Sequence, residues 1–91
     1  MIQKKSDDFI NDMSRLKWAC RRGMLELDQL LGGFLANAYS DLADEEKHAF
    51  VRLLEASDPE IFAWLLGQKE PDDESLAGIV MRIRSYARSQ F

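Results

Sequence analysis

Apolar residues recur at intervals of three and four along most of this 91-residue chain, and the strict alternation typical of β-strands is absent. This periodicity predicts five helices joined by short connections, and capping and stop signals set their bounds. The expected helices run from Ser6 to about Arg21–Gly23, from Met24 to about Tyr39–Asp41, from Ala43–Glu46 to about Leu54, from Asp58 to Gly67, and onward from a polar loop over Gln68–Asp73.

The clearest helix start lies in the run from Ser57 to Glu60. Asp58 is expected to cap the fourth helix, with Pro59 at its first position, and Ser6 is expected to cap the first helix. The positions expected to face the core are Phe9, Met13, Leu16 and Ala19 in the first helix, Met24, Leu27, Leu30, Leu31, Phe34, Leu35 and Ala38 in the second, Ala49, Phe50, Leu53 and Leu54 in the third, Ile61, Phe62, Trp64, Leu65 and Leu66 in the fourth, and Leu76, Ile79, Val80, Ile83 and Ala87 in the fifth.

Five helices with short connections predict an all-α fold, a compact five-helix bundle that forms a single domain over residues 1–91. Within the second helix, the Gly32–Gly33 pair either weakens the helix or lets a neighbouring helix approach closely. No apolar run approaches the roughly 20 residues that cross a bilayer, so no direct membrane insertion is expected. The first residues lack the apolar stretch of a secretion signal, and Cys20 is the only cysteine. A reducing, cytoplasmic location is therefore expected.

Charge is distributed unevenly along the chain, whose formal net charge is −4. Residues 1–22 carry +3, residues 23–75 carry −10 and residues 76–91 carry +3. The favoured interpretation is that the basic ends pair with the acidic middle in the folded protein. An acidic protein of this kind is poorly suited to phosphate backbones, so no nucleic-acid partner is expected.

Residues that carry chemistry are few. His48, the only histidine, is expected to be a solvated helix residue, and the acid clusters at 44–46 and 72–74 are explained by helix starts. No spacing typical of a metal site or a phosphate-binding loop is present. Cys20 is either a thiol activated by Arg21 and Arg22 or, as is favoured, a small core residue. The four aromatic residues Trp18, Phe62, Trp64 and Tyr86 are expected in the core, with one or two exposed at an interface.

The segment from Arg22 to Glu26 breaks local rules, because a glycine inside a helix costs about 1 kcal/mol relative to alanine. In a structural interpretation, Gly23 separates two helices, the arginines cap the first helix, and Arg22 pairs with Glu26 on the surface. In a functional interpretation, Gly23 leaves a spot without a side chain between opposite charges, where another molecule can approach closely. The residues alone favour the two interpretations equally.

The same segment belongs to a longer signature, W-x-C-R-R-G-M-x-E-L-D. With this signature the chain resembles the small assembly factors that promote covalent flavin attachment in succinate dehydrogenase and fumarate reductase, over roughly residues 8 to 85. Two positions depart from the family pattern: Ala43 replaces a frequent Ser or Thr cap, for which Asp41 or Asp44 is expected to substitute, and Leu25 adds apolar surface beside the motif. The signature is matched at Trp18, Cys20, Arg21, Arg22, Gly23, Met24, Glu26, Leu27 and Asp28.

The resemblance implies a five-helix bundle that is not an enzyme. It implies binding to the flavoprotein subunit, in which FAD becomes linked autocatalytically to a histidine of that subunit. The resemblance also implies that the assembly factor binds no cofactor stably and no metal. The protein is expected to be a monomer in the bacterial cytoplasm. The partner-binding residues implied are Arg22, Gly23 and Glu26 of the RGxxE motif, with Trp18, Arg21, Met24 and Asp28 as neighbours.

Three alternatives remain at this point. The chain could be an antitoxin-type interaction module that acts on a membrane-associated toxin, a role assigned to some members of the family. It could be a helix-turn-helix regulator of nucleic acid, which the acidic middle argues against. It could be a small thiol enzyme at Cys20, for which no partner base is evident.

Overall fold

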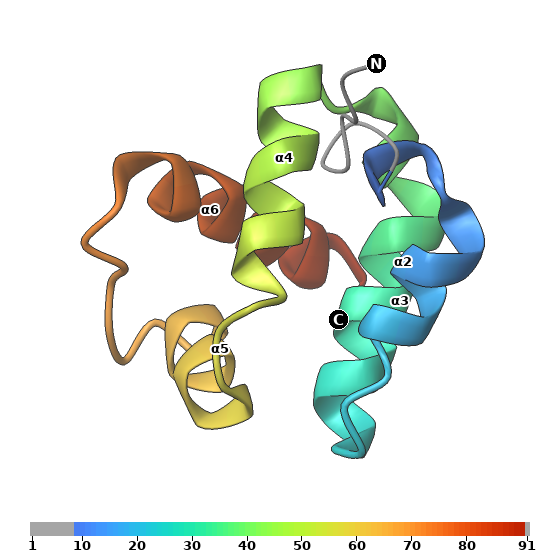
Figure 1. Cartoon of the computed structure of the whole chain (residues 1–91). Coiled ribbons are helices and arrows are strands. Elements are labelled where there is room, and N and C mark those ends of the chain that lie inside the picture. Colours follow the sequence, from blue (N-terminus) through green and yellow to red (C-terminus); the bar gives the residue numbers. More distant parts are fainter. Residues whose placement is uncertain (1–8, 91) are drawn as a thin grey trace.

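Five α-helices of seven or more residues and one short 3-10 helix make up residues 9–90, the part of the chain that this computed structural model describes (Figure 1). No strand occurs within that range, so the expected all-α, five-helix fold is confirmed. The elements are α2 (Met13–Ala19), α3 (Leu25–Asn37), η1 (Tyr39–Asp41), α4 (Asp44–Leu53), α5 (Asp58–Leu65) and α6 (Glu74–Gln90).

Helix α6 forms the centre of the core. It packs against α3, α4 and α5, and in Figure 1 it passes behind α4 and reaches α3. Its apolar face, Ile79, Val80 and Ile83, is completely buried, as the helical spacing predicts. The ring of Phe34 on α3 contacts that of Phe50 on α4, with 5.5 Å between the centroids. One continuous core therefore joins the helices on either side of α6.

The prediction of one continuous first helix is wrong, because an extended residue, Asp12, interrupts it. Residues 9–11 are helical, and the backbone of Asp12 is then extended. The side-chain carboxylate of Asp12 accepts a hydrogen bond from Arg15 N at 3.1 Å. This new N-cap changes which side chains face inward. Ile10 and Leu16 are buried, whereas Met13 is 41% exposed. The expected cap at Ser6 lies outside the described residues.

The end of α3 and the start of α4 differ from the sequence-based expectations. The second helix stops at Asn37, and Tyr39–Asp41 forms a 3-10 turn that buries the Tyr39 side chain. At the start of α4, neither Asp41 nor Asp44 replaces the missing cap. The N–H of Ala43 instead donates to Glu46 Oε1 at 2.9 Å.

At the start of α5 the cap is Ser57, not Asp58. The Ser57 hydroxyl accepts from Glu60 N at 3.3 Å, which places Asp58 and Pro59 at the first two helical positions. The one-residue shift leaves the Asp58 carboxylate free for a distant partner. Gly67 follows the helix with a φ of +79°, so the expected glycine stop is confirmed.

The basic ends of the chain pair with its acidic middle, as expected. Arg82 Nη2 lies 2.9 Å from Glu46 Oε2, and Arg84 Nη2 lies 3.0 Å from Glu70 Oε2. A third pair joins Arg22 to Asp58 across 2.7 Å. Arg84 also donates to the carbonyl of Trp64 at 2.9 and 2.6 Å, so it caps the C-terminal end of α5 as well.

Of the two adjacent glycines in α3, only Gly33 allows a close approach. A Cβ atom at Gly33 would lie 2.7 Å from Tyr86 Oη of α6, whereas a Cβ at Gly32 would meet nothing within 4 Å. The Tyr86 hydroxyl accepts a hydrogen bond from Asn37 Nδ2 at 3.0 Å. The absent side chain at Gly33 therefore determines how closely α6 packs on α3.

Candidate functional site

The residues of the RGxxE motif lie in and just after the tight turn between α2 and α3. We call the segment from Cys20 to Glu26 the RGxxE turn. Gly23 has a φ of +87°, in the left-handed region that favours glycine, and a Cβ there would meet nothing within 4 Å. The prediction that Gly23 separates two helices is confirmed. Its position also leaves the backbone of the turn open to solvent.

Asp28, one turn into α3, fixes the backbone of this turn. Its Oδ1 accepts a hydrogen bond from Arg22 N at 2.6 Å, and its Oδ2 accepts one from Gly23 N at 3.2 Å. These two N–H groups precede α3 and have no partner within the helix, so the carboxylate satisfies donors that the helix leaves open. Asp28 therefore acts on the conformation of the RGxxE turn from inside the fold.

The Arg22 side chain ties the turn to the connection between α4 and α5. Nε donates to Asp58 Oδ1 at 2.7 Å. The two terminal nitrogens donate to three backbone carbonyls, those of Ala19 at 3.1 Å, Leu54 at 2.8 Å and Ala56 at 2.9 Å. Such a set requires the planar, five-donor guanidinium of arginine. The side chain is only 15% exposed.

These contacts decide between two expectations for Arg22. The predicted surface pair with Glu26 is wrong, because the guanidinium pairs with Asp58 instead. The predicted role as a cap is confirmed for this arginine, since it donates to the carbonyl of Ala19 at the end of α2. Sequence reasoning missed Asp58 as the partner. The only available signal was its presence, with Pro59, among the downstream positions that resemble the family.

Cys20 and Leu27 form the buried floor of the turn, and both side chains are almost fully enclosed. Burial raises the pKa of the Cys20 thiol from 9.0 to about 11; the nearby Arg22 lowers it and Asp28 raises it further. The thiol is therefore protonated at neutral pH. The core interpretation of Cys20 is confirmed, and the expectation that neighbouring arginines activate it is wrong.

Most of the other side chains in and around the turn face outward. Trp18 is 73% exposed and Leu25 is 72% exposed, an unusual degree for large apolar side chains. Arg21, Gly23 and Glu26 are also exposed, and the guanidinium of Arg21 lies 5.8 Å from the centroid of the Trp18 ring. We call these five residues, of which Trp18 lies at the end of α2, the exposed face of the RGxxE turn.

Met24 occupies an intermediate position. It is half-buried and forms the extended residue before α3. The signature thus divides into side chains that hold the turn and side chains that the turn presents. The other aromatic residues follow the expectation of a mainly internal set: Trp64 is buried, and Phe62 and Tyr86 are half-buried.

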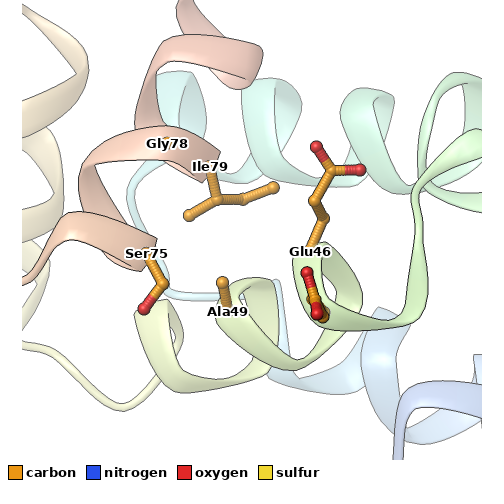
Figure 2. Close-up of a pocket in the computed structure, with 6 residues that line it drawn as sticks. Glu46, Ala49, Ser75, Gly78 and Ile79 are labelled. Carbon is orange, nitrogen blue, oxygen red and sulfur yellow. The ribbon is translucent and has the colours of Figure 1, made fainter.

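A shallow pocket of about 210 Å³ lies between α4 and α6. Figure 2 shows Ser75, Gly78 and Ile79 on α6 facing Glu46 and Ala49 on α4. Two of its three polar side chains are already engaged: Glu46 binds Arg82, and the Ser75 hydroxyl donates to Asp73 at 2.6 Å, while the third, Glu45, is exposed. Within residues 9–90, no group of three or more His, Cys, Asp or Glu side chains is arranged to hold a metal. The pocket therefore offers little chemistry.

A second, more apolar depression of about 330 Å³ lies where α3, α5 and α6 meet. We call it the α3–α5–α6 groove. Glu26 of the RGxxE turn contributes to its wall, so it adjoins the exposed face described above. Leu66, expected in the core, is 54% exposed on its rim. The lining residues are Glu26, Leu27, Gln29, Leu30, Phe62, Leu65, Leu66 and Ala87.

Residues 14–87 match the protein family described as flavinator of succinate dehydrogenase. The chain belongs to this family. It is 51% identical over 76 residues to the FAD assembly factor SdhE of Shewanella oneidensis, which covers 84% of this chain and 93% of that protein. It is 47% identical over 77 residues to the protein of the same name from Idiomarina loihiensis, covering 85% and 86% of the two chains.

The fold is also that of a solved relative. The solution structure of a UPF0350 protein superposes with a TM-score of 0.73 at 37% identity, covering 99% of this chain and 89% of that one. The expected family is therefore confirmed. The relatives are named as assembly factors and not as catalysts, in agreement with the expectation that this member of the flavinator family is not an enzyme. No helix within residues 9–90 is long and apolar enough to cross a membrane.

Proposed function

We propose that this protein is an FAD assembly factor for succinate dehydrogenase, which binds the flavoprotein subunit and promotes covalent attachment of FAD to it. The flavoprotein subunit of fumarate reductase is a second client in this proposal. One observation carries it: four residues of the family signature, Trp18, Arg21, Gly23 and Glu26, are exposed together with Leu25 at and beside a turn that Arg22 and Asp28 hold in place. A rigid, outward-facing turn of this kind suits recognition of a protein surface.

The exposed face combines the features of a protein interface. Trp and Arg are the residues that most often dominate binding energy, and Trp18 and Arg21 lie together here. Gly23 leaves room for the partner to approach the backbone of the turn. Glu26 adds a charge that favours one orientation of the partner. Arg22, Asp28 and the half-buried Met24 support binding by keeping these groups in register.

In this proposal, covalent attachment of FAD needs no reactive group on the assembly factor. Binding stabilises the conformation of the flavoprotein subunit in which FAD and its acceptor histidine are correctly placed, and so increases the population that reacts. Correct placement alone lowers a reaction barrier by several kcal/mol. FAD remains on the client subunit throughout, and the assembly factor acts as a monomer in the bacterial cytoplasm.

The proposal is tested by the ultraviolet fluorescence of the flavoprotein subunit in denaturing gels, from cells with and without this protein. The covalent flavin band is expected to disappear without the protein and to return with the wild type. It is not expected to return with Gly23→Arg, which fills the open spot on the turn. Gly78→Arg is the matched control, because Gly78 lies exposed on α6 and a Cβ there meets nothing within 4 Å.

Gly23→Arg also strains the backbone, so a second variant separates folding from binding. Trp18→Ala removes a side chain that is 73% exposed and leaves the backbone unchanged. It is expected to fold as the wild type does by circular dichroism and to fail in restoring the flavin band. A flavin band that persists without the protein would refute the proposal. Capture of a membrane toxin in place of the flavoprotein subunit would favour the antitoxin role.

A further inference from the structure

The α3–α5–α6 groove is an apolar surface that the fold itself leaves open. Phe62, Leu65 and Leu30 are half-buried along it, and Leu66 stands 54% exposed at its rim. Figure 1 shows the helices that surround it: α5, the first turns of α3 and the end of α6. Contiguous apolar surface of this kind, bordered by polar side chains, is typical of an interaction site.

The polar side chains of the groove are unused within the fold. Glu26 and Gln29, both exposed on α3, are its only polar lining residues. Among residues 9–90, neither side chain forms a hydrogen bond or an ion pair, whereas Glu46, in the wall of the pocket between α4 and α6, is paired with Arg82. Glu26 carries the only formal charge in the lining. An occupant therefore gains most by bringing a positive charge to this end of the groove.

Glu26 also makes the groove continuous with the exposed face of the RGxxE turn. The same carboxylate belongs to the motif and to the groove wall, and Leu25, beside it, is 72% exposed. A partner seated on the turn therefore lies next to the open end of the groove. The groove alone is too small for a specific protein interface, which buries about 1,200–2,000 Å² in total. It fits the role of an anchor pocket at the edge of a larger contact.

We propose that the α3–α5–α6 groove receives a large apolar side chain of the flavoprotein subunit, next to a basic residue that pairs with Glu26. This inference rests on the proposed function and adds a second contact region to it. The apolar floor selects the inserted side chain, and the carboxylate at one end sets the direction of the segment that carries it. A single inserted side chain in such a pocket often dominates the energy of an interface.

The lining argues against a small ligand as the natural occupant. Sites for small molecules place several polar groups around an apolar cavity, and these groups fix the orientation of the ligand. The groove has polar side chains only from α3, at positions 26 and 29. FAD in particular carries charged phosphates, whereas the only charge in the lining is the negative one of Glu26. An apolar side chain with a basic neighbour satisfies both parts of the lining.

The apolar contact is tested by titrating the purified flavoprotein subunit with the full-length protein and its variants. Leu66→Glu places a charge on the rim and is expected to weaken binding at least tenfold, as the loss of an interface anchor does. Met81→Glu is the matched control, because Met81 is 62% exposed on α6 outside the groove. It is expected to bind within twofold of the wild type. Equal binding by Leu66→Glu and the wild type would overturn the proposal.

The charge is tested with two substitutions at Glu26. Binding is expected to weaken in the order wild type, Glu26→Gln, Glu26→Lys, and the affinity of Glu26→Gln is expected to depend less on salt concentration than that of the wild type. Glu45→Lys makes the same change of charge at an exposed site on α4, away from the groove, and is expected to bind as the wild type does. Tighter binding by Glu26→Lys would overturn the proposal that a basic residue of the flavoprotein subunit pairs with Glu26.

These outcomes separate the groove from the proposed function itself. If the wild type fails to bind the flavoprotein subunit, both proposals are overturned. If the wild type binds and Trp18→Ala does not, but Leu66→Glu binds normally, only the groove proposal is overturned. In a final experiment, free FAD is titrated into the isolated wild type and into Leu66→Glu to measure binding of FAD. Binding of FAD that Leu66→Glu abolishes would make the groove a flavin site and overturn its assignment to a protein side chain.

Discussion

At the scale of single residues, Arg22 shows how one position of the RGxxE motif can serve the interior of a protein. Its guanidinium reaches the Asp58 carboxylate at the start of α5 and three carbonyls, those of Ala19 at the end of α2 and of Leu54 and Ala56 between α4 and α5. The carbonyls of Ala19 and Leu54 belong to helix ends, which have no partner inside their own helices. Arg22 therefore satisfies several backbone groups at once, and the exposed face of the RGxxE turn depends on it.

Arg22→Ala is expected to lower the free energy of unfolding by about 2–3 kcal/mol, because it leaves the Asp58 carboxylate and three carbonyls without their donor. Arg22→Lys is expected to recover little, since one ammonium group cannot reach acceptors on both connections. Urea denaturation measures both changes. Arg21→Ala, at the neighbouring exposed position, is the control and is expected to change stability by less than about 0.5 kcal/mol. Equal effects at the two arginines would contradict the internal role of Arg22.

The buried thiol predicts a pH dependence at the alkaline end. In the unfolded chain the Cys20 pKa is near 9.0, and in the folded protein it is about 11. Between these values the unfolded state has lost a proton that the folded state keeps, so stability is expected to fall as pH rises from about 9 to 11. Burial raises the pKa of Tyr39 from 10.0 to about 12, which acts in the same direction.

Urea denaturation at pH 8 and pH 10 measures this loss, and Cys20→Ala is expected to reduce the pH dependence. Thiol modification offers an independent check, since the native protein is expected to react far more slowly at pH 8 than the protein in urea. Rapid modification of the native protein would show that Cys20 is not held in the core.

At the scale of elements, two adjacent glycines in α3 have opposite roles. Gly32 has open space around it, so an alanine at this position changes only the helix propensity. Gly33 lies against Tyr86, whose hydroxyl also accepts from Asn37, so a methyl group there displaces a hydrogen-bonded side chain. The sequence pattern alone could not assign these roles, because the difference arises from the position of α6.

Gly32→Ala is expected to raise the free energy of unfolding by about 0.5–1 kcal/mol, the usual gain from replacing glycine in a helix. Gly33→Ala is expected to lower it by about 1 kcal/mol through crowding against Tyr86 Oη. Thermal or urea unfolding compares the two variants. The double variant Gly33→Ala with Tyr86→Phe is expected to relieve the crowding, because the next ring atom lies 3.5 Å from the added Cβ. A stabilising Gly33→Ala would disprove the close approach.

At the scale of the whole molecule, charges from the two ends hold the acidic middle in place. Arg84 is the clearest case, since it donates to the carbonyl of Trp64 at the end of α5 and pairs with Glu70 in the following loop. It thereby fixes α5 on α6 and supports one wall of the α3–α5–α6 groove. Together with the pair between Arg82 and Glu46, it joins the basic C-terminal helix to the acidic middle of the chain.

Arg84→Ala is expected to destabilise the protein by about 1–3 kcal/mol, because it removes the charged donor that ties the Trp64 carbonyl to α6 and leaves that carbonyl only the N–H of Gly67. It is also expected to increase hydrogen exchange in α5 more than in α4. Arg88→Ala, which removes an exposed arginine one turn further along α6, is the control and is expected to be nearly neutral. Uniform exchange across both helices would show that Arg84 does not hold α5 specifically.

The sequence by itself determined the helices, most of their core positions, the pairing of the basic ends with the acidic middle, and the family. These properties follow from periodicity, glycine stops and residue order, which are local or compositional. It misplaced the cap of α5 by one residue and missed the interruption at Asp12, because several neighbouring side chains there are equally good caps.

Only the tertiary structure decided which residues of the signature face inward. The contact between Arg22 and Asp58 spans 36 positions, and no local pattern encodes a contact between two residues so far apart in sequence. Likewise, Cys20 and Leu27 are buried while Trp18 and Leu25 are exposed, although all four stand within one stretch of ten residues. A helical pattern gives the spacing of a buried face. Which face is covered depends on the helices that pack against it, and the groove exists because no element of residues 9–90 covers that end of α3.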